Sequence, residues 1–598
     1  MNKVLVTSIG YRKAYPVVKS LKHRGAYVIG TLTTKDFPNI AFSRFIDKVY
    51  KISDPRLNVY KYILDIKRIV VHEGVKLIVP IGFIDFFSLS KFYEELSRYT
   101  IVPVPPFEIL RAVSDKYKLK DLTKRIGIKY PKTVLYPRAD FKSILEQIGL
   151  PVVVKFRGDF SRPTIVFDKG KLKEELNKRG VCLVQEYVVG QGVGFFGFAI
   201  NGKLLAFFMH KRIAEVDPLG GPSAIACSNV EPKLYELGKR FITYTKWTGV
   251  IMVEFKKDEE RGELYLIEVN PKFWGSLDLS VSSGIDFPGY LYDYYVLGKM
   301  PNPKHYNKNV CFAWIEDLLG YIKINKAYGI KRCFHELIKH PLHNDSHLMS
   351  LDPAYTMMYS LRVGSRIFKL SQGWQKLRES NLTSLMRLIK YRNPSKLIMI
   401  SDLDGTLIKL RVPWDTIKRK LIECGFLKDY ENIFAFLYKK RKTKLFERVN
   451  TILKEYELAA IDYIKRDPIL RRAICKLRKY CTLLCIISKQ SKDIVKKVLK
   501  KLEIEDVIDL IIGREDALLR INQVMYCLKY VDINENVVVG LGDTLTDMKS
   551  YTKLGITSVL ITMGSPLKSY WGYKLGLPYT TNVYALSKAI ELIMGSNK

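Results

Sequence analysis

Two groups of carboxylates stand at the ends of apolar segments and could bind metal ions. In the first group, Glu254 ends the apolar run 250–255, and Glu268 and Asn270 end the run 264–269. Residues i and i+2 of a strand face the same side, so Glu268 and Asn270 should point together across a strand–turn–strand. Three such oxygen ligands suit Mg²⁺ beside nucleotide phosphates. We therefore predict a metal site here, against the simpler interpretation of a hairpin with acidic ends.

The second group follows three apolar segments near the C-terminus, at 396–401, 483–487 and 537–541. An aspartate pair follows the first segment, a serine the second, and another aspartate pair the third. One carboxylate could attack phosphorus, a second could transfer a proton, and the others could hold Mg²⁺. The first aspartate pair is Asp402 and Asp404, with Thr406 close behind. The serine is Ser488, and the second aspartate pair is Asp543 and Asp547.

Alternating apolar segments open the chain. A strand at 3–9 is followed by a helix at 14–23 and a strand at 26–31, and 48–52 and 77–80 read as further strands. This alternation is typical of a doubly wound, Rossmann-like α/β domain. Because the sequence lacks G-x-G-x-x-G there, we do not predict dinucleotide binding.

The first 300 residues resemble the ATP-grasp superfamily, the carboxylate–amine and carbamoyl-phosphate type of ligase. Beside the hairpin, the family's elements occur in order: Ser114-Asp115-Lys116, Pro131 and Thr133, the strand 151–155, the hinge strand 181–187, His210-Lys211-Arg212 and Gly220-Gly221-Pro222-Ser223. The resemblance implies a pre-ATP-grasp Rossmann-like domain over 1–105 and an ATP-grasp fold over 106–300. One glycine in the loop 157–163, where many members have several, indicates a stiffer lid.

The same resemblance implies roles for individual residues. Lys116 and Lys155 would contact ATP phosphates, Val188 would hold adenine through its backbone with Glu186 in support, and Glu254, Glu268 and Asn270 would bind Mg²⁺. A carboxylate pocket would be formed by His210, Arg212, Gly220, Gly221, Ser223 and Lys272, the last standing where the family often has arginine. An arginine fork and a glycine turn with free N–H groups both suit an anion.

The second group resembles the haloacid-dehalogenase-like (HAD) phosphatases, over a domain at 395–598 with a small helical cap at about 408–480. The resemblance implies that Asp402 is the nucleophile and Asp404 the general acid and base. Mg²⁺ would lie on Asp402, Asp543 and the backbone carbonyl of Asp404, supported by Asp547, and Thr406 and Ser488 would contact the phosphoryl group. The family's basic residue precedes the third motif by some twenty residues, so Arg520, 23 residues before Asp543, is preferred to Lys529.

Length and composition limit the kinds of protein that this chain can form. With 598 residues, 47% hydrophobic and 26% charged, the chain should form three or four globular domains. We predict a cytoplasmic protein without a signal peptide or transmembrane segment, and we expect its nine scattered cysteines to be reduced and mostly buried. The net charge of +38 fits phosphorylated ligands, acidic substrates, nucleic acid or simply a lysine-rich surface.

A helical tail and basic linker should occupy residues 301–394. We expect helices over 301–360, and we favour a solvated basic loop over a metal site for the cluster of His335, His340, His343 and His347. The stretch 362–396 is rich in Lys and Arg and has apolar residues at helical spacing. It predicts a basic amphipathic helix, either packed as a linker or in contact with nucleic acid or an acidic membrane surface.

These patterns predict a bifunctional enzyme with ATP and Mg²⁺ as cofactors, Mn²⁺ being the alternative ion. One part would be a carboxylate–amine ligase acting through an acyl phosphate on small substrates, and the other a phosphatase for a phosphorylated small molecule. Two alternatives belong to other classes. A nucleic-acid end-processing phosphatase with an ATP-binding module has the charge but not aromatic residues interleaved with a basic groove. An ATP-binding regulatory protein is disfavoured by the intact carboxylates of both groups.

Overall fold

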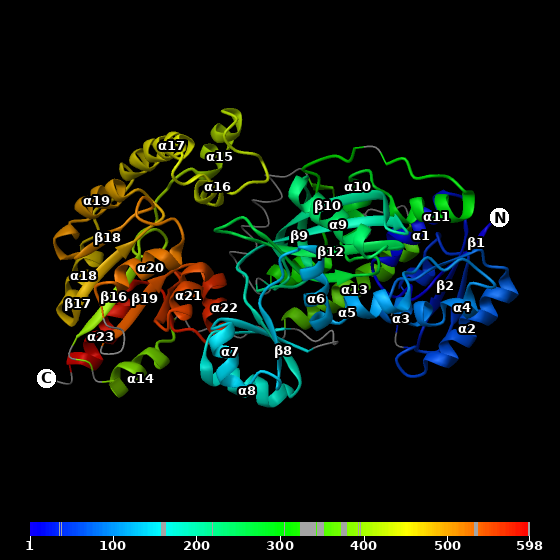
Figure 1. The fold of residues 1–598 in the computed structure, drawn as a ribbon, viewed down its shortest axis with the longest axis horizontal. Helices are drawn as coiled ribbons and strands as arrows, with labels where there is room; N and C mark the ends of the chain where they lie inside the picture. The colour runs from blue at the N-terminus through cyan, green and yellow to red at the C-terminus, as the bar shows by residue number, and fades with distance from the viewer. Residues whose placement is uncertain are drawn as a thin grey trace. The chain divides into compact units, whose positions relative to one another are not determined.

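The computed structural model describes all residues except 35, 37–38, 157–162, 218, 304, 323–341, 344–351, 372–379, 393, 395, 532–535 and 596–598. The chain divides into two compact units (Figure 1). The first contains Met1–Pro131, Gln191–Lys257 and Leu264–Trp374, and the second contains Lys132–Gly190, Asp258–Glu263 and Gln375–Lys598. The predicted ATP-grasp segment 106–300 therefore contributes residues to both units. No helix of the described chain is long and apolar enough to cross a membrane.

A four-stranded parallel sheet of order β3-β2-β1-β4 opens the first unit. Its strands are β1 (Lys3–Val6), β2 (Tyr27–Leu32), β3 (Lys48–Lys51) and β4 (Leu77–Val79), joined by helices α1 (Ala14–His23) and α2 (Val59–Glu73) and the short η1 (Asn39–Phe42). β1 and β4 are apolar runs whose side chains are almost all buried, as expected of a parallel sheet covered on both faces. The predicted α/β alternation is confirmed, although β1 ends three residues earlier than expected.

A seven-stranded sheet of order β13-β12-β9-β10-β11-β14-β15 forms the rest of the first unit's strands. The strands are β9 (Gly190–Ile200), β10 (Lys203–Glu215), β11 (Ser223–Ser228), β12 (Gly249–Asp258), β13 (Leu264–Asn270), β14 (Cys311–Ala313) and β15 (Leu342–His343). The predicted strand–turn–strand is confirmed as β12 and β13. Other helices in the described part of this unit are α3 (Phe83–Lys91), α4 (Tyr93–Leu96), α5 (Phe107–Ser114), α6 (Lys116–Ile126), α9 (Pro232–Tyr244), α10 (Leu277–Ser282), α11 (Phe287–Leu297) and α13 (Pro353–Ser371), and residues 315–322 are also helical.

The connector differs from the sequence-based expectation. β14 and β15 are strands inside the span 301–360 that was predicted to be helical, and His343 belongs to β15 rather than to a loop. The predicted basic helix is interrupted, because Asn381 forms a bridge with Tyr579 before α14 (Thr383–Arg392) begins. Helical spacing cannot reveal such breaks, since β pairing depends on partners far away in sequence. His335, His340 and His347 lie outside the described residues.

The sequence analysis predicted that all cysteines are reduced, and the structure contradicts this prediction. Cys227 of β11 and Cys311 of β14 lie directly opposite each other on neighbouring strands and form a disulfide. Because 84 residues separate them in sequence, no spacing pattern indicates this pair. Of the other described cysteines, Cys182, Cys481, Cys485 and Cys527 are buried free thiols, Cys475 is partly buried and Cys424 is exposed.

The second unit contains a small antiparallel sheet and a larger parallel one. The small sheet has the order β5-β8-β6-β7, with β5 (Thr133–Tyr136), β6 (Val152–Lys155), β7 (Thr164–Val166), β8 (Cys182–Glu186) and helices α7 (Phe141–Gln147) and α8 (Lys169–Arg179). The strands β6 and β8 agree with the strands predicted at 151–155 and 181–187.

The larger sheet is fully parallel, in the order β18-β17-β16-β19-β20-β21. Its strands are β16 (Leu397–Asp402), β17 (Cys481–Ile487), β18 (Leu510–Ile512), β19 (Val537–Gly542), β20 (Thr557–Ile561) and β21 (Tyr579–Thr580). Helices α18 (Pro468–Tyr480) and α23 (Val583–Gly595) pack together on one face, and α20 (Arg520–Leu528) and α21 (Leu545–Lys553) on the other (Figure 1). α19 (Lys492–Lys501), the short η2 (Glu505–Val507) and α22 (Pro566–Leu575) complete this domain.

Three helices are inserted between β16 and α18, within the predicted cap. They are α15 (Trp414–Glu423), α16 (Ile433–Lys440) and α17 (Lys444–Ile461), and α15 and α16 both pack against α17. α18, the last helix of the predicted cap span 408–480, packs instead against β17 and α23. The inserted helices therefore end near residue 461, and α18 belongs to the helices that cover the sheet.

Candidate functional site

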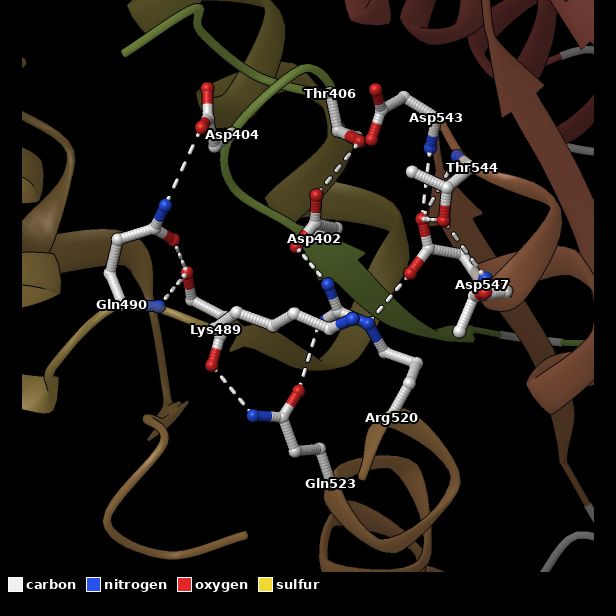
Figure 2. A network of polar contacts seen from close by, with 12 residues as sticks. Asp402, Asp404, Thr406, Lys489, Gln490, Arg520, Gln523, Asp543, Thr544 and Asp547 are labelled. Atoms are coloured by element: carbon white, nitrogen blue, oxygen red, sulfur yellow. Dashed lines mark hydrogen bonds and ion pairs between the residues drawn. The ribbon is translucent and has the colours of Figure 1, made fainter. Parts of the chain in front are cut away.

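The carboxyl ends of three adjacent strands bring the C-terminal motifs together. β16 lies between β17 and β19, with Asp402 opposite Ile487 and Ser401 opposite Leu541. Asp402, Ser488 and Asp543 therefore end or follow neighbouring parallel strands, where open α/β sheets commonly place their ligands. Figure 2 shows the side chains that gather there.

Asp402, Asp543 and Asp547 form a buried cluster of carboxylates. One oxygen from each lies within 4.8 Å of the others, and Asp402 is 3% exposed. Burial raises the pKa of Asp402 well above its usual range, Arg520 opposes this rise, and Asp547 and Asp543 add to it. Three buried like charges need a counter-charge, and carboxylate oxygens are the ligands that Mg²⁺ prefers.

A glycine provides room beside this cluster. Gly405 has φ +84°, and a Cβ atom built on it would lie 2.2 Å from a carboxylate oxygen of Asp543. Any side chain at this position would therefore displace the carboxylate, so the glycine of the predicted motif is required by close approach as well as by its backbone conformation. The residues present fit a divalent cation.

Arg520 supplies the cation that the sequence analysis placed here. Its guanidinium donates to Asp402 at 2.7 Å and pairs with Asp547 at 2.6 Å, and Arg520 is 4% exposed. Gln523, one turn along α20, accepts from Arg520 at 2.8 Å and donates to the carbonyl of Ser488 at 2.6 Å. Lys529, the second choice from sequence spacing, lies at the other end of α20 over the Tyr526 ring.

Asp404 occupies a different environment from the three clustered aspartates. One of its oxygens accepts from the backbone N–H of Leu410 at 2.8 Å, and the other accepts from the Gln490 amide at 3.4 Å. Burial raises the pKa of Asp404 to about 6, against the opposing effect of the Leu410 N–H and with a contribution from Asp543. A carboxyl group that titrates near neutrality suits a general acid.

The two predicted phosphate-binding hydroxyls both make hydrogen bonds to neighbouring side chains of the site. Thr406 donates to Asp402 at 3.4 Å (Figure 2). Ser488 donates to the side chain of Gln490. Gln490 therefore joins Ser488 to Asp404, a bridge that no motif in the sequence indicates, although its position two residues after Ser488 fits a side chain at the same strand end.

Two more contacts were missed by sequence reasoning. Lys568 of α22 donates to Asp543 at 2.6 Å, so a second cation reaches the carboxylates. Arg514 pairs with Glu457 of α17 at 2.5 Å, both side chains being fully buried, and also donates to the carbonyl of Lys489 at 3.2 Å. Arg514 thus connects the inserted helix α17 to the segment after β17. Lysines and arginines are frequent throughout this chain, so composition alone could not single out either residue.

In the first unit, Arg212 joins the predicted carboxylate pocket to the predicted metal ligands. Its guanidinium pairs with Glu254 at 2.8 Å and with Glu215 at 3.2 Å, and it donates to the carbonyl of Gly221 at 3.0 Å. Arg212 lies on β10 and Glu254 on β12, with β9 between them. The side chain passes close to β9 at Gly192, where a Cβ would lie 2.8 Å from Arg212 Cδ.

The hairpin places Glu254 directly opposite Glu268, and Asn270 opposite Met252. Burial raises the pKa of Glu254, Arg212 opposes this, and the charge of Glu268 adds to it. The oxygen of Asn270 accepts from Lys272 at 3.1 Å. Two facing carboxylates and an amide oxygen on one hairpin fit Mg²⁺ as ligands.

The glycine loop differs in part from the prediction of free N–H groups. The backbone N–H of Gly220 donates to the carbonyl of Asp217 at 2.9 Å, because the loop closes as a tight turn before Ser223 begins β11. The N–H of Gly220 is therefore engaged within the turn, and Gly221 contributes its carbonyl to Arg212 instead.

His210 is buried without a hydrogen-bond partner. It is 1% exposed, its ring meets the Phe196 ring edge-on at 4.7 Å, and neither ring nitrogen has a partner in the part of the chain that the structure describes. Burial, aided by the charge of Arg212, lowers the pKa of His210 to about 3. The imidazole is therefore neutral at pH 7.

A pH-dependent stability follows from His210. Between pH 6.5 and about 3 the unfolded chain binds a proton that the folded chain does not, so stability should fall as the pH falls through this range. The full shift corresponds to about 4–5 kcal/mol. Melting temperatures at pH 4 to 7 should decline less steeply for His210→Gln than for the wild type. The exposed His72→Gln is the matched control, and equal pH slopes for all three proteins would contradict the expectation.

The remaining predicted ATP ligands lie on well-defined elements. Asp115 accepts from the N–H groups of Tyr117 and Lys118, which caps α6 and makes Lys116 its first residue. In the second unit, Lys155 ends β6 and donates to Gln185 at 2.7 Å. Glu186 ends β8, and Val188 is buried just after it. The predicted lid residues 157–162 lie outside the described chain.

Comparisons with known proteins match both resemblances found in the sequence, a hydrolase at the C-terminal end and a ligase elsewhere. Residues 399–561 match the family model of haloacid dehalogenase-like hydrolases. A carbamoyl-phosphate synthase of Methanobrevibacter smithii is 24% identical over 36% of this chain and 62% of its own length. A D-alanine–D-alanine ligase of Neisseria gonorrhoeae is 29% identical over 26% of this chain and 56% of its own length. The chain thus spans about three fifths of the curated relatives that it matches.

A similar solved structure is the biotin carboxylase domain of the Hydrogenobacter thermophilus 2-oxoglutarate carboxylase, in complex with MgADP, ADP and bicarbonate. It is 18% identical, covers 52% of this chain and 73% of its own, and has a TM-score of 0.43.

Proposed function

We propose that this chain, whose residues 399–561 match haloacid dehalogenase-like hydrolases, is a bifunctional enzyme. One activity would be Mg²⁺-dependent hydrolysis of a small phosphate monoester, and the other ATP- and Mg²⁺-dependent ligation of a carboxylate to an amine. The observation that supports the first activity is the buried cluster of Asp402, Asp543 and Asp547 with Arg520 bonded into it.

In the hydrolysis, an oxygen of Asp402 attacks phosphorus and the bond to the leaving oxygen breaks, while Asp404 gives its proton to that oxygen. Asp404 then takes a proton from water, and the water oxygen attacks the aspartyl phosphate. Phosphate leaves and Asp402 is restored. Arg520, Thr406 and Ser488 hold the phosphoryl oxygens. Asp402, Asp543, Asp547 and the Asp404 carbonyl would hold Mg²⁺, which neutralises charge on those oxygens when bound.

The ligation rests on the group around Glu254, Glu268 and Arg212. A carboxylate oxygen of the substrate would attack the γ-phosphorus of ATP, releasing ADP and forming an acyl phosphate, and the amine would then displace phosphate. Arg212 orients the carboxylate and balances the charge that the facing glutamates bring into a buried region. Glu254, Glu268 and Asn270 would hold Mg²⁺ for the ATP phosphates.

Two assays on the purified full-length chain test this proposal. Hydrolysis of p-nitrophenyl phosphate should require Mg²⁺ and be abolished by a chelator. ADP release should require a carboxylate, and hydroxylamine in place of the amine should trap the acyl phosphate as a hydroxamate. A protein that hydrolyses no phosphate ester and forms no hydroxamate with any amino acid or small acid would contradict both parts.

Arg212→Ala should reduce the efficiency of hydroxamate formation about 30- to 1000-fold. Removing a buried charged hydrogen bond costs about 2–4 kcal/mol. The loss of Arg212 also leaves Glu254 without its ion pair. The loss should appear mainly in the kinetics of the carboxylate rather than in the KM for ATP. Arg240→Ala removes a surface arginine of the same unit and should have no effect. Normal ligation by Arg212→Ala would show that the carboxylate is held elsewhere.

A further inference from the structure

A segment of the N-terminal domain contacts the chain just after the hairpin. In the first unit, the ammonium of Lys13, between β1 and α1, donates to the carbonyl of Phe273 at 2.7 Å. Arg12 donates to the carbonyl of Gly275 at 3.3 Å. Lys272, the neighbour of Phe273, donates to Asn270 at 3.1 Å. Two lysines from distant parts of the sequence therefore lie close to the predicted metal ligands of the hairpin.

The neighbouring cations differ in how their charge is balanced. Arg12 pairs with Asp317 at 2.8 Å. Lys13 makes no ion pair with any described residue: beside the Phe273 carbonyl, it has only the Tyr11 ring at 5.5 Å. The carboxylate of Asp85 acts on Lys13 from a distance, but it is buried and accepts from Thr7 and from the Gly82 N–H. The partly buried ammonium of Lys13 lacks a counter-charge, which is less favourable than in open water.

The electrostatics of the two lysines agree with this geometry. Burial lowers the pKa of Lys13 well below its usual range, and the charge of Lys272 lowers it further. The two ammonium groups repel each other, and a bound anion would relieve both effects at once.

Two buried side chains that contact the Phe196 ring have hydrogen-bonding groups without a partner among the described residues. Trp274, two residues after Lys272, has a buried indole N–H with no partner among the described residues. Its ring contacts the Phe196 ring at 4.4 Å, and His210, also without a partner, contacts the same ring at 4.7 Å. Buried donors in folded proteins are nearly always paired, so the unpaired indole N–H of Trp274 would suit a ligand with acceptor oxygens.

We propose that Lys13 and Lys272 bind a second anionic group of the ligase substrate. The substrate would be a carboxylate that also carries another carboxylate or a phosphate, rather than a simple monocarboxylate. This inference rests on the proposed ligase and extends it: the first carboxylate is the group that is activated, and the lysines recognise the second anionic group. Lys13 then determines which substrates bind. It belongs to the N-terminal domain, whereas the predicted metal ligands belong to the hairpin.

Matched ligands that differ by one anionic group test the inference. Alanine is compared with aspartate, serine with O-phosphoserine, and glycerate with 3-phosphoglycerate, using hydroxamate formation by the full chain. The chain carries Asp402→Asn so that phosphate esters are not hydrolysed. At least one dianionic acid should have a KM about 10- to 100-fold below its partner, the range expected for a charge-assisted hydrogen bond. A preference for aspartate identifies the second group as a carboxylate, and a preference for O-phosphoserine or 3-phosphoglycerate identifies it as a phosphate.

Lys13→Met should remove this preference, and Lys13→Arg should restore most of it. Lys76→Met, an exposed lysine of the same domain, should leave the preference unchanged. The inference is overturned if Lys13→Met retains the preference with a normal melting temperature, or if no dianionic acid is preferred by the parent chain. If no acid yields a hydroxamate with either the Asp402→Asn chain or the wild-type chain, the ligase proposal fails. Calorimetric binding of the same pairs to the parent chain and Lys13→Met then decides the anion site, and equal affinities within each pair overturn it.

Discussion

Asp402→Asn should reduce the hydrolysis of phosphate monoesters by about 10⁵-fold or more, because an amide cannot form the aspartyl phosphate. Asparagine keeps the size of the side chain and can still accept from Thr406 and Arg520, which contact Asp402 in the wild type. The fold should therefore persist. The measurement is Mg²⁺-dependent hydrolysis of p-nitrophenyl phosphate by the full-length chain.

Mg²⁺ binding gives this variant a second readout. The substitution removes one of three clustered carboxylates, so the melting temperature without metal should stay level or rise, since like charges repel less. The rise in melting temperature that Mg²⁺ causes should become smaller, because a ligand has been lost. The matched control is Asp462→Asn, an exposed aspartate at the end of α17. Undiminished hydrolysis by Asp402→Asn would exclude Asp402 as the nucleophile.

Hydroxamate formation should survive in Asp402→Asn if the two activities are chemically independent, as we propose. Loss of both activities in a variant with an unchanged melting temperature would instead indicate that one site depends on the other. That result would contradict independence without affecting the assignment of the nucleophile.

The catalytic groups were predictable from sequence wherever the chemistry lies within a short motif. Asp402 and Asp404 are two residues apart at the end of an apolar run, and that run is β16. Glu254 and Glu268 lie within the neighbouring strands β12 and β13, which are joined by a turn of only a few residues, so their pairing follows from local pattern. Arg520 was preferred to Lys529 by spacing alone, and it is Arg520 that contacts the aspartates.

Groups that act from a distance were not predictable. Lys568 reaches Asp543 from a helix that follows another strand, and Lys13 reaches Phe273 across 260 residues of sequence. Each is one lysine in a strongly basic chain, so neither its type nor its spacing marks it. The disulfide between Cys227 and Cys311 depends in the same way on β11 and β14 being neighbours. The linear domain boundaries likewise could not anticipate that both compact units draw on residues of 106–300.

Glu268→Ala should reduce ATP-dependent hydroxamate formation by about 10³- to 10⁴-fold, since Mg²⁺ commonly supplies several kcal/mol to phosphoryl transfer. Glu268 lies opposite Glu254 in the hairpin, and its charge contributes to raising the pKa of Glu254. Without Glu268, Glu254 should ionise more readily and remain paired with Arg212. The hairpin should therefore stay folded while the metal site loses one of its two carboxylates.

The dependence on Mg²⁺ separates loss of a metal ligand from damage to the hairpin. For Glu268→Ala, the Mg²⁺ concentration giving half-maximal rate should rise at least about 10-fold, as expected for a weakened metal site. Glu268→Asp, which keeps the charge on a shorter side chain, should lie between the variant and the wild type. Glu236→Ala on the surface of α9 serves as the control. An unchanged Mg²⁺ requirement in an inactive Glu268→Ala protein would mean that Glu268 does not bind the metal, and the two facing glutamates would then need another role, such as orienting Arg212.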